Sequence, residues 1–437
     1  MRRLVVLFGV IGVLCVSATS LWAGGIINKS NQSADYFRSL TRNAATDAAD
    51  IVVYNPAGIM KMDDGLYTKL DILYVAKKYS NSVPDQTPFF ANEEGDFSTD
   101  TPSVIPGFFA VYKQENWAGF FAVSIPGGGG KVEYDEGSAY TSLLALNFWL
   151  QTGGAMGLSP YSGLESASLE GDSYDIGYTL GGAYKINAMF SFAGGLRYID
   201  ATQNFEGQLD LTTAAAVPHE FEVKLERSAT GWAGFLGLNV TPTENLNVGL
   251  LYFTNTSLNM KSDVDKDTSG GSITEALGWS DGTKRHEDLP GLLGVGVSYR
   301  ITPKLRAEVD YTHYFEDLAK LDSASGRFDH AGDSYDFAMS CEYAFTPQWK
   351  ASLGYMITDI KGMEPEQLFP VAPELDARTW AIGAAYIPSD RLQFSFGYTF
   401  VDYASVTTQN RGSNSPIGTE LEKETWALSL GAQYRWF

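Results

Sequence analysis

The histidines are the residues of this sequence best suited to catalysis or metal binding. The four of them, His219, His286, His313 and His330, are scattered and lack the short spacings of a metal site. A hydrolase would need a serine or an aspartate paired with one of them. The sequence identifies no such partner for His313, which shares one side of its predicted strand with Tyr311. We therefore predict neither an enzyme nor a bound metal or cofactor.

A second candidate site is the segment Pro126–Gly130, a proline followed by four glycines, with Lys131 directly after it. In a phosphate-binding loop the lysine is followed by serine or threonine, whereas Val132 follows here. Proline removes a donor from a strand ladder, and glycine weakens strand pairing. The segment therefore predicts that a strand over Trp117–Ile125 ends at a weak point of a sheet. An ordinary flexible entry to a loop is the alternative.

The charge of the chain is strongly negative. There are 31 Lys and Arg against 52 Asp and Glu among 437 residues, and 31 − 52 gives −21, which argues against a nucleic-acid partner. The acidic residues collect in predicted long loops, such as Asp263, Asp265 and Asp267. A solvated surface explains them, and divalent cations bridging these loops to anionic lipid are the alternative.

The first 23 residues are typical of a secretory signal peptide. A basic start at Met1–Arg3 precedes the apolar run Leu4–Val16, and small residues follow before Gly24. Cleavage after Ala18 is an alternative to cleavage after Ala23. The mature chain would then keep only Cys341, so we expect no intrachain disulfide.

Alternation with a period of two indicates the fold of residues 65–437. From Tyr174 to Ile186 large apolar residues alternate with small or polar ones, with aromatic residues toward both ends of the apolar face, and the pattern recurs along the chain. No run of ~18 apolar residues follows the signal, so membrane-spanning helices are not expected. The pattern is typical of a transmembrane β-barrel, with a soluble β-sandwich as the alternative.

The connections support a barrel of about 14 strands. Short turns alternate with long loops, as in outer-membrane barrels whose short turns face the periplasm. We predict short turns at 113–116, 186–188, 241–245, 302–304, 346–348 and 388–391. We predict long loops near 80–101, 127–165, 202–220, 259–287, 320–332, 360–375 and 405–420.

Charged residues on the inward side of the predicted strands are expected to form ion pairs in the lumen, because unpaired charges in a confined space are costly. These residues are Arg197, Arg300, Arg306, Lys350, Glu308, Asp310 and Asp336.

Residues 24–64 do not alternate and are predicted to form a partly helical hatch that plugs the lumen. A barrel of this size encloses a space wide enough to need filling or to conduct. The segment contains Ser33-Ala34, an alanine-rich stretch with Ala48 and Asp50, and the motif Asn55-Pro56-Ala57-Gly58. In these elements the chain resembles the FadL family of outer-membrane long-chain fatty-acid and hydrocarbon transporters. Arg42-Asn43 departs from the glycine-containing turn of that family.

The resemblance implies that loops capture a hydrophobic ligand, which reaches a pocket above the hatch and leaves sideways near a kinked third strand. Pro126, Gly127 and Gly128 are the candidates for that lateral opening. Candidate ligand-binding residues lie in apolar loop segments, of which Tyr140–Leu150 shows helical spacing. They are Leu143, Leu146, Phe148, Trp149, Leu277 and Trp279, with Leu368-Phe369 in a third loop. Packing against the barrel mouth is the alternative.

We therefore expect a multi-pass β-barrel in the outer membrane of a Gram-negative-type bacterium, acting as a monomer. Its expected partners are a hydrophobic small molecule, outer-membrane lipid and lipopolysaccharide, and the barrel-assembly machinery. A porin for polar solutes and a structural or adhesive barrel are the alternative functions.

Overall fold

The computed structural model describes residues 33–84, 95–323, 326–327, 332–361, 364, 367–409 and 414–437. The predicted signal peptide and residues 24–32 of the predicted hatch lie outside the described residues, as does His330. Among the described helices, none is both long enough and apolar enough to cross a bilayer.

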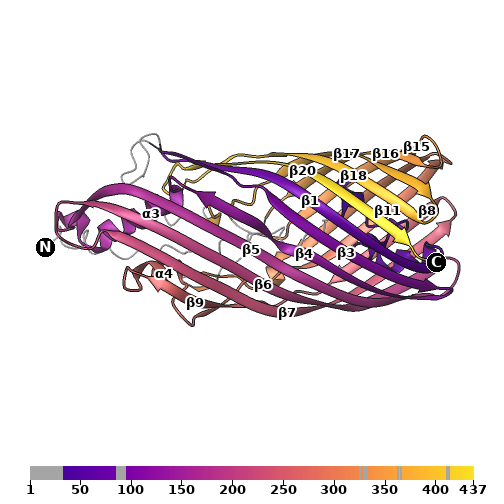
Figure 1. Cartoon of the computed structure of the whole chain (residues 1–437), viewed down its shortest axis with the longest axis horizontal. Coiled ribbons are helices and arrows are strands. Elements are labelled where there is room, and N and C mark those ends of the chain that lie inside the picture. The colour runs from indigo at the N-terminus through magenta and orange to yellow at the C-terminus, as the bar shows by residue number, and fades with distance from the viewer. Residues whose placement is uncertain are drawn as a thin grey trace.

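Fourteen long strands of the described chain form one closed antiparallel barrel (Figure 1). Each pairs with its neighbours along the chain, and the last pairs with the first from Tyr67–Arg435 to Ser82–Glu420. Closure removes the sheet edges, whose unpaired backbone groups would be costly in lipid. The strands are β1 (Gly65–Ser82), β3 (Ser103–Gln114), β4 (Trp117–Tyr134), β5 (Tyr161–Lys185), β6 (Phe190–Thr213), β7 (Glu220–Thr243), β8 (Leu246–Phe253), β11 (Gly291–Thr302), β12 (Leu305–Phe315), β15 (Tyr335–Ala344), β16 (Trp349–Asp359), β17 (Ala377–Ser389), β18 (Leu392–Tyr403) and β20 (Glu420–Arg435).

Short elements fill the lumen and the loops. Before β1 lie α2 (Ala34–Phe37) and the 3-10 helices η2 (Ala49–Val53) and η3 (Pro56–Lys61). In the long loops lie β2 (Asp96–Asp100), α3 (Ala139–Gln151), η4 (Gly154–Met156), β9 (Asn259–Asp267), α4 (Ser272–Leu277), β10 (Lys284–His286), η5 (Glu316–Leu318), β13 (Asp322–Ser323), β14 (Gly326–Arg327) and β19 (Val406–Thr407).

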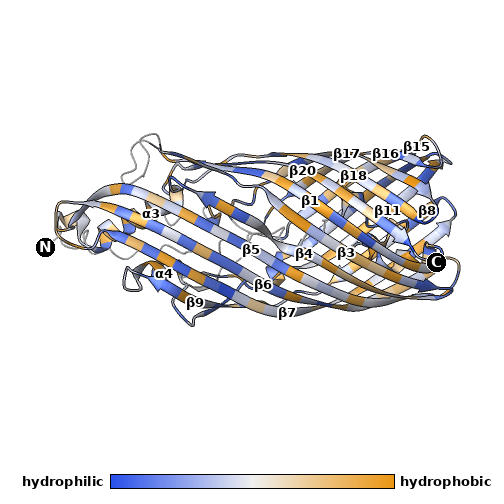
Figure 2. Cartoon of the chain, viewed as in Figure 1, coloured by the Kyte–Doolittle hydropathy of each residue, from blue (hydrophilic) through white to orange (hydrophobic). Residues whose placement is uncertain are grey.

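The predicted alternation is confirmed in the strands. Leu180, Leu196 and Leu236 point outward and are 66%, 55% and 68% exposed, while Thr179, Arg197 and Phe235 between them are buried. In Figure 2 apolar segments recur along the strands toward the end of the barrel that holds the C-terminus. An outward apolar belt of this kind matches the hydrocarbon core of a membrane.

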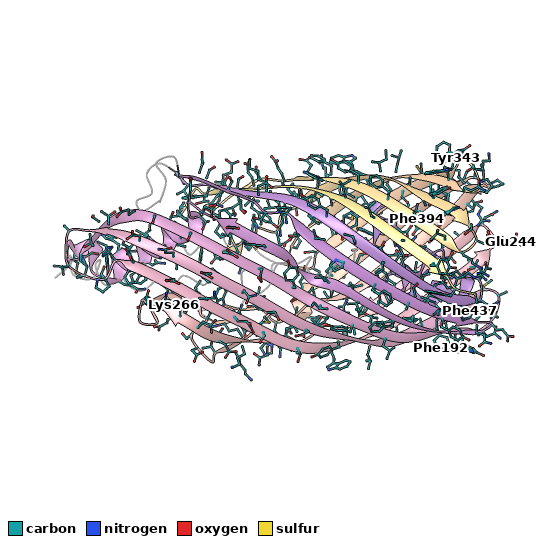
Figure 3. All side chains as sticks on the ribbon, viewed as in Figure 1. Phe192, Glu244, Lys266, Tyr343, Phe394 and Phe437 are labelled. Carbon is teal, nitrogen blue, oxygen red and sulfur yellow. The ribbon has the colours of Figure 1, made fainter. Side chains whose placement is uncertain are left out.

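The two ends of the barrel differ as predicted. The end with short turns carries outward aromatic residues, among them Tyr343, Phe394 and Phe192, and the C-terminal Phe437 lies there too (Figure 3). Lys266 lies at the opposite end, where α3, α4 and β9 gather (Figures 1 and 3). The short-turn end is the periplasmic one, and the protein is a multi-strand barrel of the outer membrane.

Strands β5, β6 and β7 are much taller than a membrane requires. They contain 25, 24 and 24 residues, which at ~3.3 Å per residue is about 80 Å along the strand, whereas ~9–11 residues suffice to span a bilayer. Their upper halves therefore stand above the membrane on the outer side.

This height makes two predicted boundaries wrong. Most of the predicted loop 202–220 is strand, because above the membrane the outward positions face water and lose the apolar signal. The third long strand, β4, does not end at Ile125 but continues to Tyr134. Two register shifts accommodate Pro126 and the glycines.

Candidate functional site

An apolar cluster of buried side chains occupies the outer end of the barrel. It joins strand residues from β4 to β7 with residues of α3, of α4 and of the loop after β16. We call it the loop cluster. Phe205 lies 5.6 Å from Trp279 between ring centroids, and Tyr140 lies 4.7 Å from Phe369. Segments from four distant parts of the sequence thus share one apolar surface above the lumen.

Helix α3 supplies several of the predicted ligand-binding residues. A capping box between Ser138 and Thr141 starts the helix and satisfies its first backbone N–H groups. Leu143 is buried, whereas Leu146, Phe148 and Trp149 are partly buried and pack on the cluster, with Phe148 4.9 Å from the Phe221 ring. Burial also raises the pKa of Tyr140. These three partly exposed side chains are more accessible than Leu143.

Helix α4 brings Leu277 and Trp279 to the same cluster. Asp267 fixes this short helix by accepting hydrogen bonds from the backbone N–H (3.2 Å) and the hydroxyl (2.8 Å) of Thr274. Partial burial acts to raise the pKa of Asp267, but hydrogen bonds from Ser269 and Thr274 stabilise the carboxylate and hold its pKa below the ordinary value. Leu277 and Trp279 are 0% and 1% exposed, so they belong to the fully buried part of the cluster.

The motif Asn55-Pro56-Ala57-Gly58 folds as the start of η3. Asn55 caps the helix by accepting from the Gly58 N–H (3.3 Å), and Pro56 occupies the first helical position. The Asn55 amide also donates to Asn239 of β7 (2.8 Å) and to the Ala45 carbonyl (3.0 Å). A Cβ on Gly58 would lie 2.4 Å from that amide nitrogen. The motif therefore needs asparagine at its start for the cap and glycine at its end for space.

The hatch, which in the structure means residues 33–64, is held by a network of buried charges. Asp50 accepts from the Ser33 hydroxyl (2.6 Å) and pairs with Arg42 (2.7 Å). Arg42 also pairs with Asp47 (2.7 Å), and Lys69 of β1 reaches Asp35 (3.1 Å). Buried charges paired in this way hold their partners firmly, because removing one leaves the other uncompensated.

The hatch backbone follows the inner wall of the barrel. Ser39, Arg42 and Asn43 pass successive strands, and the Arg42 and Asn43 N–H groups both donate to Asp310 of β12 (2.7 and 2.8 Å). The approach is close enough that a Cβ on Gly354 of β16 would lie 2.1 Å from the Ser39 carbonyl oxygen. Asn43 therefore lies in a turn that is held against the barrel wall by Asp310. The turn packs closely on the wall although it has asparagine where the family has glycine.

The predicted lumen ion pairs are confirmed in part. Arg306 pairs with Glu308 (2.9 Å) and Lys350 with Glu342 (3.4 Å). Asp310, however, holds hatch backbone N–H groups, and Arg300 is exposed near the periplasmic rim. Sequence reasoning missed the ion pair between Arg38 and Glu342. A charged residue inside a predicted plug indicates that the barrel wall supplies an opposite charge, and Arg38 could have been found in this way.

The barrel wall is irregular where Pro126, Gly127 and Gly128 lie. The ladder between β3 and β4 ends at the pair Phe108–Val123, although both strands continue outward. On the other side, β4 twice uses three residues against two of β5, between Ser124 and Gly130. We call β4 residues 124–130, with the facing β3 residues 103–107, the seam. A Cβ on Gly130 would lie 2.1 Å from the Ser103 hydroxyl. β3 and β4 therefore pack closely at the outer end of the seam.

An apolar cluster includes two residues of the seam and extends beyond it. Ile105 of β3 and Ile125 of β4 are buried together with Leu73 and Ala427, and Phe37 of the hatch and Tyr174 of β5 pack against them. Apolar residues thus connect the hatch to the part of the wall where strand pairing is irregular.

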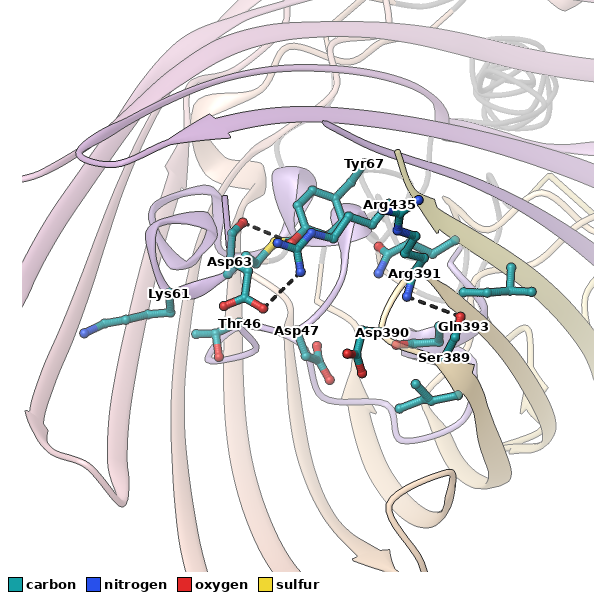
Figure 4. A pocket seen from close by; sticks show the side chains of 14 residues that line it. Thr46, Asp47, Lys61, Asp63, Tyr67, Ser389, Asp390, Arg391, Gln393 and Arg435 are labelled. Carbon is teal, nitrogen blue, oxygen red and sulfur yellow. Dashed lines mark hydrogen bonds and ion pairs between the residues drawn. The ribbon is translucent and has the colours of Figure 1, made fainter. Parts of the chain in front are cut away.

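A cavity of about 260 Å³ lies on the periplasmic side of the hatch (Figure 4). Asp47 of the hatch, Tyr67 and the rim residues Asp390 and Arg391 contribute to its lining, and Arg435 pairs across it with Asp63 (3.2 Å). Most of the lining side chains are polar or charged, so the route straight down the barrel does not suit an apolar molecule.

Comparison with known proteins gives one family match. The model of the family described as outer membrane protein transport protein (OMPP1/FadL/TodX) matches residues 163–436. A search of curated proteins found no match.

Solved structures share the fold. A FadL homologue of Pseudomonas aeruginosa is 15% identical with a TM-score of 0.68, and the match covers 94% of this chain and 100% of that one. The toluene transporter TodX of Pseudomonas putida is 14% identical with a TM-score of 0.63 (95% and 99% covered). The toluene transporter TbuX of Ralstonia pickettii is 14% identical with a TM-score of 0.62 (93% and 98% covered).

Proposed function

Because the chain belongs to the OmpP1/FadL/TodX family of outer-membrane transport proteins, we propose that it takes up long-chain fatty acids or related hydrocarbons by lateral exit. The ligand binds at the loop cluster, moves to a pocket above the hatch, and leaves through the seam into the membrane. Relatives of the same fold named as toluene transporters support the choice of a hydrophobic ligand.

The irregular seam with apolar residues beside it is the observation that carries this proposal. A ligand held by apolar contact gains ~25 cal/mol for each Å² of apolar surface that it removes from water. Passing the hatch and the polar periplasmic cavity would forfeit that gain, whereas the seam leads from an apolar interior to the membrane. The lateral route offers the ligand apolar contacts with Ile105, Ile125 and Leu73.

Mass spectrometry of material that co-purifies with the detergent-extracted protein tests the proposed ligand site. We expect apolar molecules to be retained, and the double variant Phe148→Ala with Trp149→Ala to retain several-fold less, because these side chains border the loop cluster. Trp232→Ala is the matched control, since Trp232 is an exposed aromatic on the outer wall. Equal retention by the loop variant and by the wild type would place the ligand elsewhere.

Salt dependence is expected to separate charged from neutral ligands. The chain carries a net charge of −21, with acidic loops on the outer side, so a fatty-acid anion should be repelled as it approaches. Screening extends over ~30 Å at 0.01 M salt and ~8 Å at physiological strength. Binding of a long-chain carboxylate should therefore tighten a few-fold as salt rises, while binding of a neutral arene stays constant. Carboxylate binding that weakens with salt would require a basic head-group site instead.

A further inference from the structure

The tip of the β6–β7 hairpin brings together three side chains of metal-binding type. Asp210 near the end of β6 is directly opposite Glu220 at the start of β7, and this is the last pair of their ladder. His219 precedes Glu220, and its carbonyl accepts from the Leu211 N–H (2.9 Å). One potential ligand atom from each of the three residues lies within 4.8 Å of the others. We infer that Asp210, His219 and Glu220 form a binding site for a divalent metal ion of the zinc class.

Two further features of the hairpin tip favour a cation. Carboxylates placed directly opposite each other in an antiparallel pair repel, and a shared cation converts that repulsion into attraction. In addition, the Asp210 Oδ1 atom is buried and has no hydrogen-bond partner among the described residues. A cation at this position would give the Asp210 Oδ1 atom the partner that it lacks among the described residues.

A backbone carbonyl fixes one ring nitrogen of His219. Its Nδ1 lies 3.2 Å from the carbonyl oxygen of Val217. A carbonyl only accepts, so Nδ1 carries the proton and Nε2 carries the lone pair. A backbone carbonyl on the second ring nitrogen is the usual arrangement around a metal-bound histidine.

The donor set selects the class of metal. One imidazole and two carboxylates suit Zn²⁺, which binds nitrogen and oxygen at ~2.0–2.2 Å, with a water molecule at the fourth position. Ca²⁺ and Mg²⁺ prefer oxygen ligands alone. Ligand atoms around zinc lie roughly 3.5 Å apart at those bond lengths. The three potential ligand atoms now lie within 4.8 Å of one another, and the exposed side chains of His219 and Glu220 have room to rotate toward a bound ion.

The proposed metal site lies next to the loop cluster. Leu209, Leu211 and Phe221 flank the three ligands in sequence and are buried members of the cluster. A bound ion would join the ends of β6 and β7 at the point where these residues are held. The metal would therefore hold the outermost part of the apolar surface in place, whichever molecule that surface binds.

Titration of the chelator-treated, detergent-extracted protein with Zn²⁺ alone tests the site by calorimetry. We expect one saturable equivalent, at least tenfold weaker binding in His219→Ala and in Asp210→Asn, and at least tenfold weaker binding of Ca²⁺ to the wild type. His313→Ala is the matched control, because His313 also lies beside a carboxylate, that of Asp333 (3.1 Å), and it should change Zn²⁺ affinity less than twofold.

Two results would overturn the inference. One is equal Zn²⁺ binding by the wild type and by His219→Ala, with both proteins folded as shown by heat-modifiable migration in gels. The other is Ca²⁺ binding as tight as Zn²⁺ binding, since that would indicate general attraction to acidic loops.

Discussion

Deletion of residues 28–55 is expected to raise single-channel conductance in planar bilayers by an order of magnitude or more. In the structure, residues 33–55 lie inside a fourteen-stranded barrel. The deletion removes the charged residues Asp35, Arg38 and Asp50 together with the hatch residues of the buried apolar core. A barrel of this circumference leaves a continuous aqueous space once its contents are gone. The expected rise in conductance therefore follows from the position of residues 33–55 inside the barrel.

A variant that displaces the hatch without shortening the chain provides a second measurement. Gly354→Leu and Gly249→Leu together place side chains where a Cβ alone would lie 2.1 Å from the Ser39 carbonyl oxygen and 1.9 Å from that of Asn43. We expect conductance to rise as in the deletion. Gly234→Leu is the matched control, because the space beside Gly234 is open and the hatch should remain seated. Conductance that stays at the wild-type level in both the deletion and the displacement variant would contradict the assignment of a plug.

Closing the seam is expected to reduce uptake of a neutral hydrophobe at least fivefold while the barrel still assembles. Replacing Pro126 and Gly127 by valine restores a backbone donor and a strand-forming side chain where β3 and β4 leave their ladder. Gly128 is left unchanged because its φ of +79° would be strained with any side chain. Uptake into cells that carry each variant is the measurement.

Gly119→Val serves as the control for the seam variant. Gly119 is on the same strand in the regular ladder, and an added Cβ would meet open space, so uptake should match the wild type. Normal uptake by a folded seam variant would show that the ligand leaves by another route.

Much of the fold was predictable because a membrane imposes a simple pattern on a strand. Outward positions such as Leu180 and Leu236 face lipid and must be apolar, while the inward positions are small or polar, so period-two alternation appears in the sequence. The short turns were equally visible, since the turn at 303–304 lies directly between two such strands. The family resemblance rested on the hatch motif. Its asparagine is needed because the side chain of Asn55 caps the helix that follows.

The features that the sequence did not reveal depend on contacts above the membrane or across the lumen. The upper part of β6 around Leu209 lies above the membrane, so its outward residues face water and are polar. The outward apolar residues that reveal a membrane strand in the sequence are therefore missing there. The continuation of β4 beyond Gly130 depends on two register shifts, which require knowledge of β5. Asp210 and Glu220 face each other because of the hairpin register, and His219 comes close to both as the residue before Glu220.

Uptake of a labelled neutral arene, compared between cells with and without the protein, is the decisive measurement of hydrophobe transport. We expect protein-dependent uptake of the arene and, in the same preparation, no steady ion conductance from the intact chain. Steady conductance of ions without any gain in arene uptake would contradict this expectation and would indicate a pore for polar solutes.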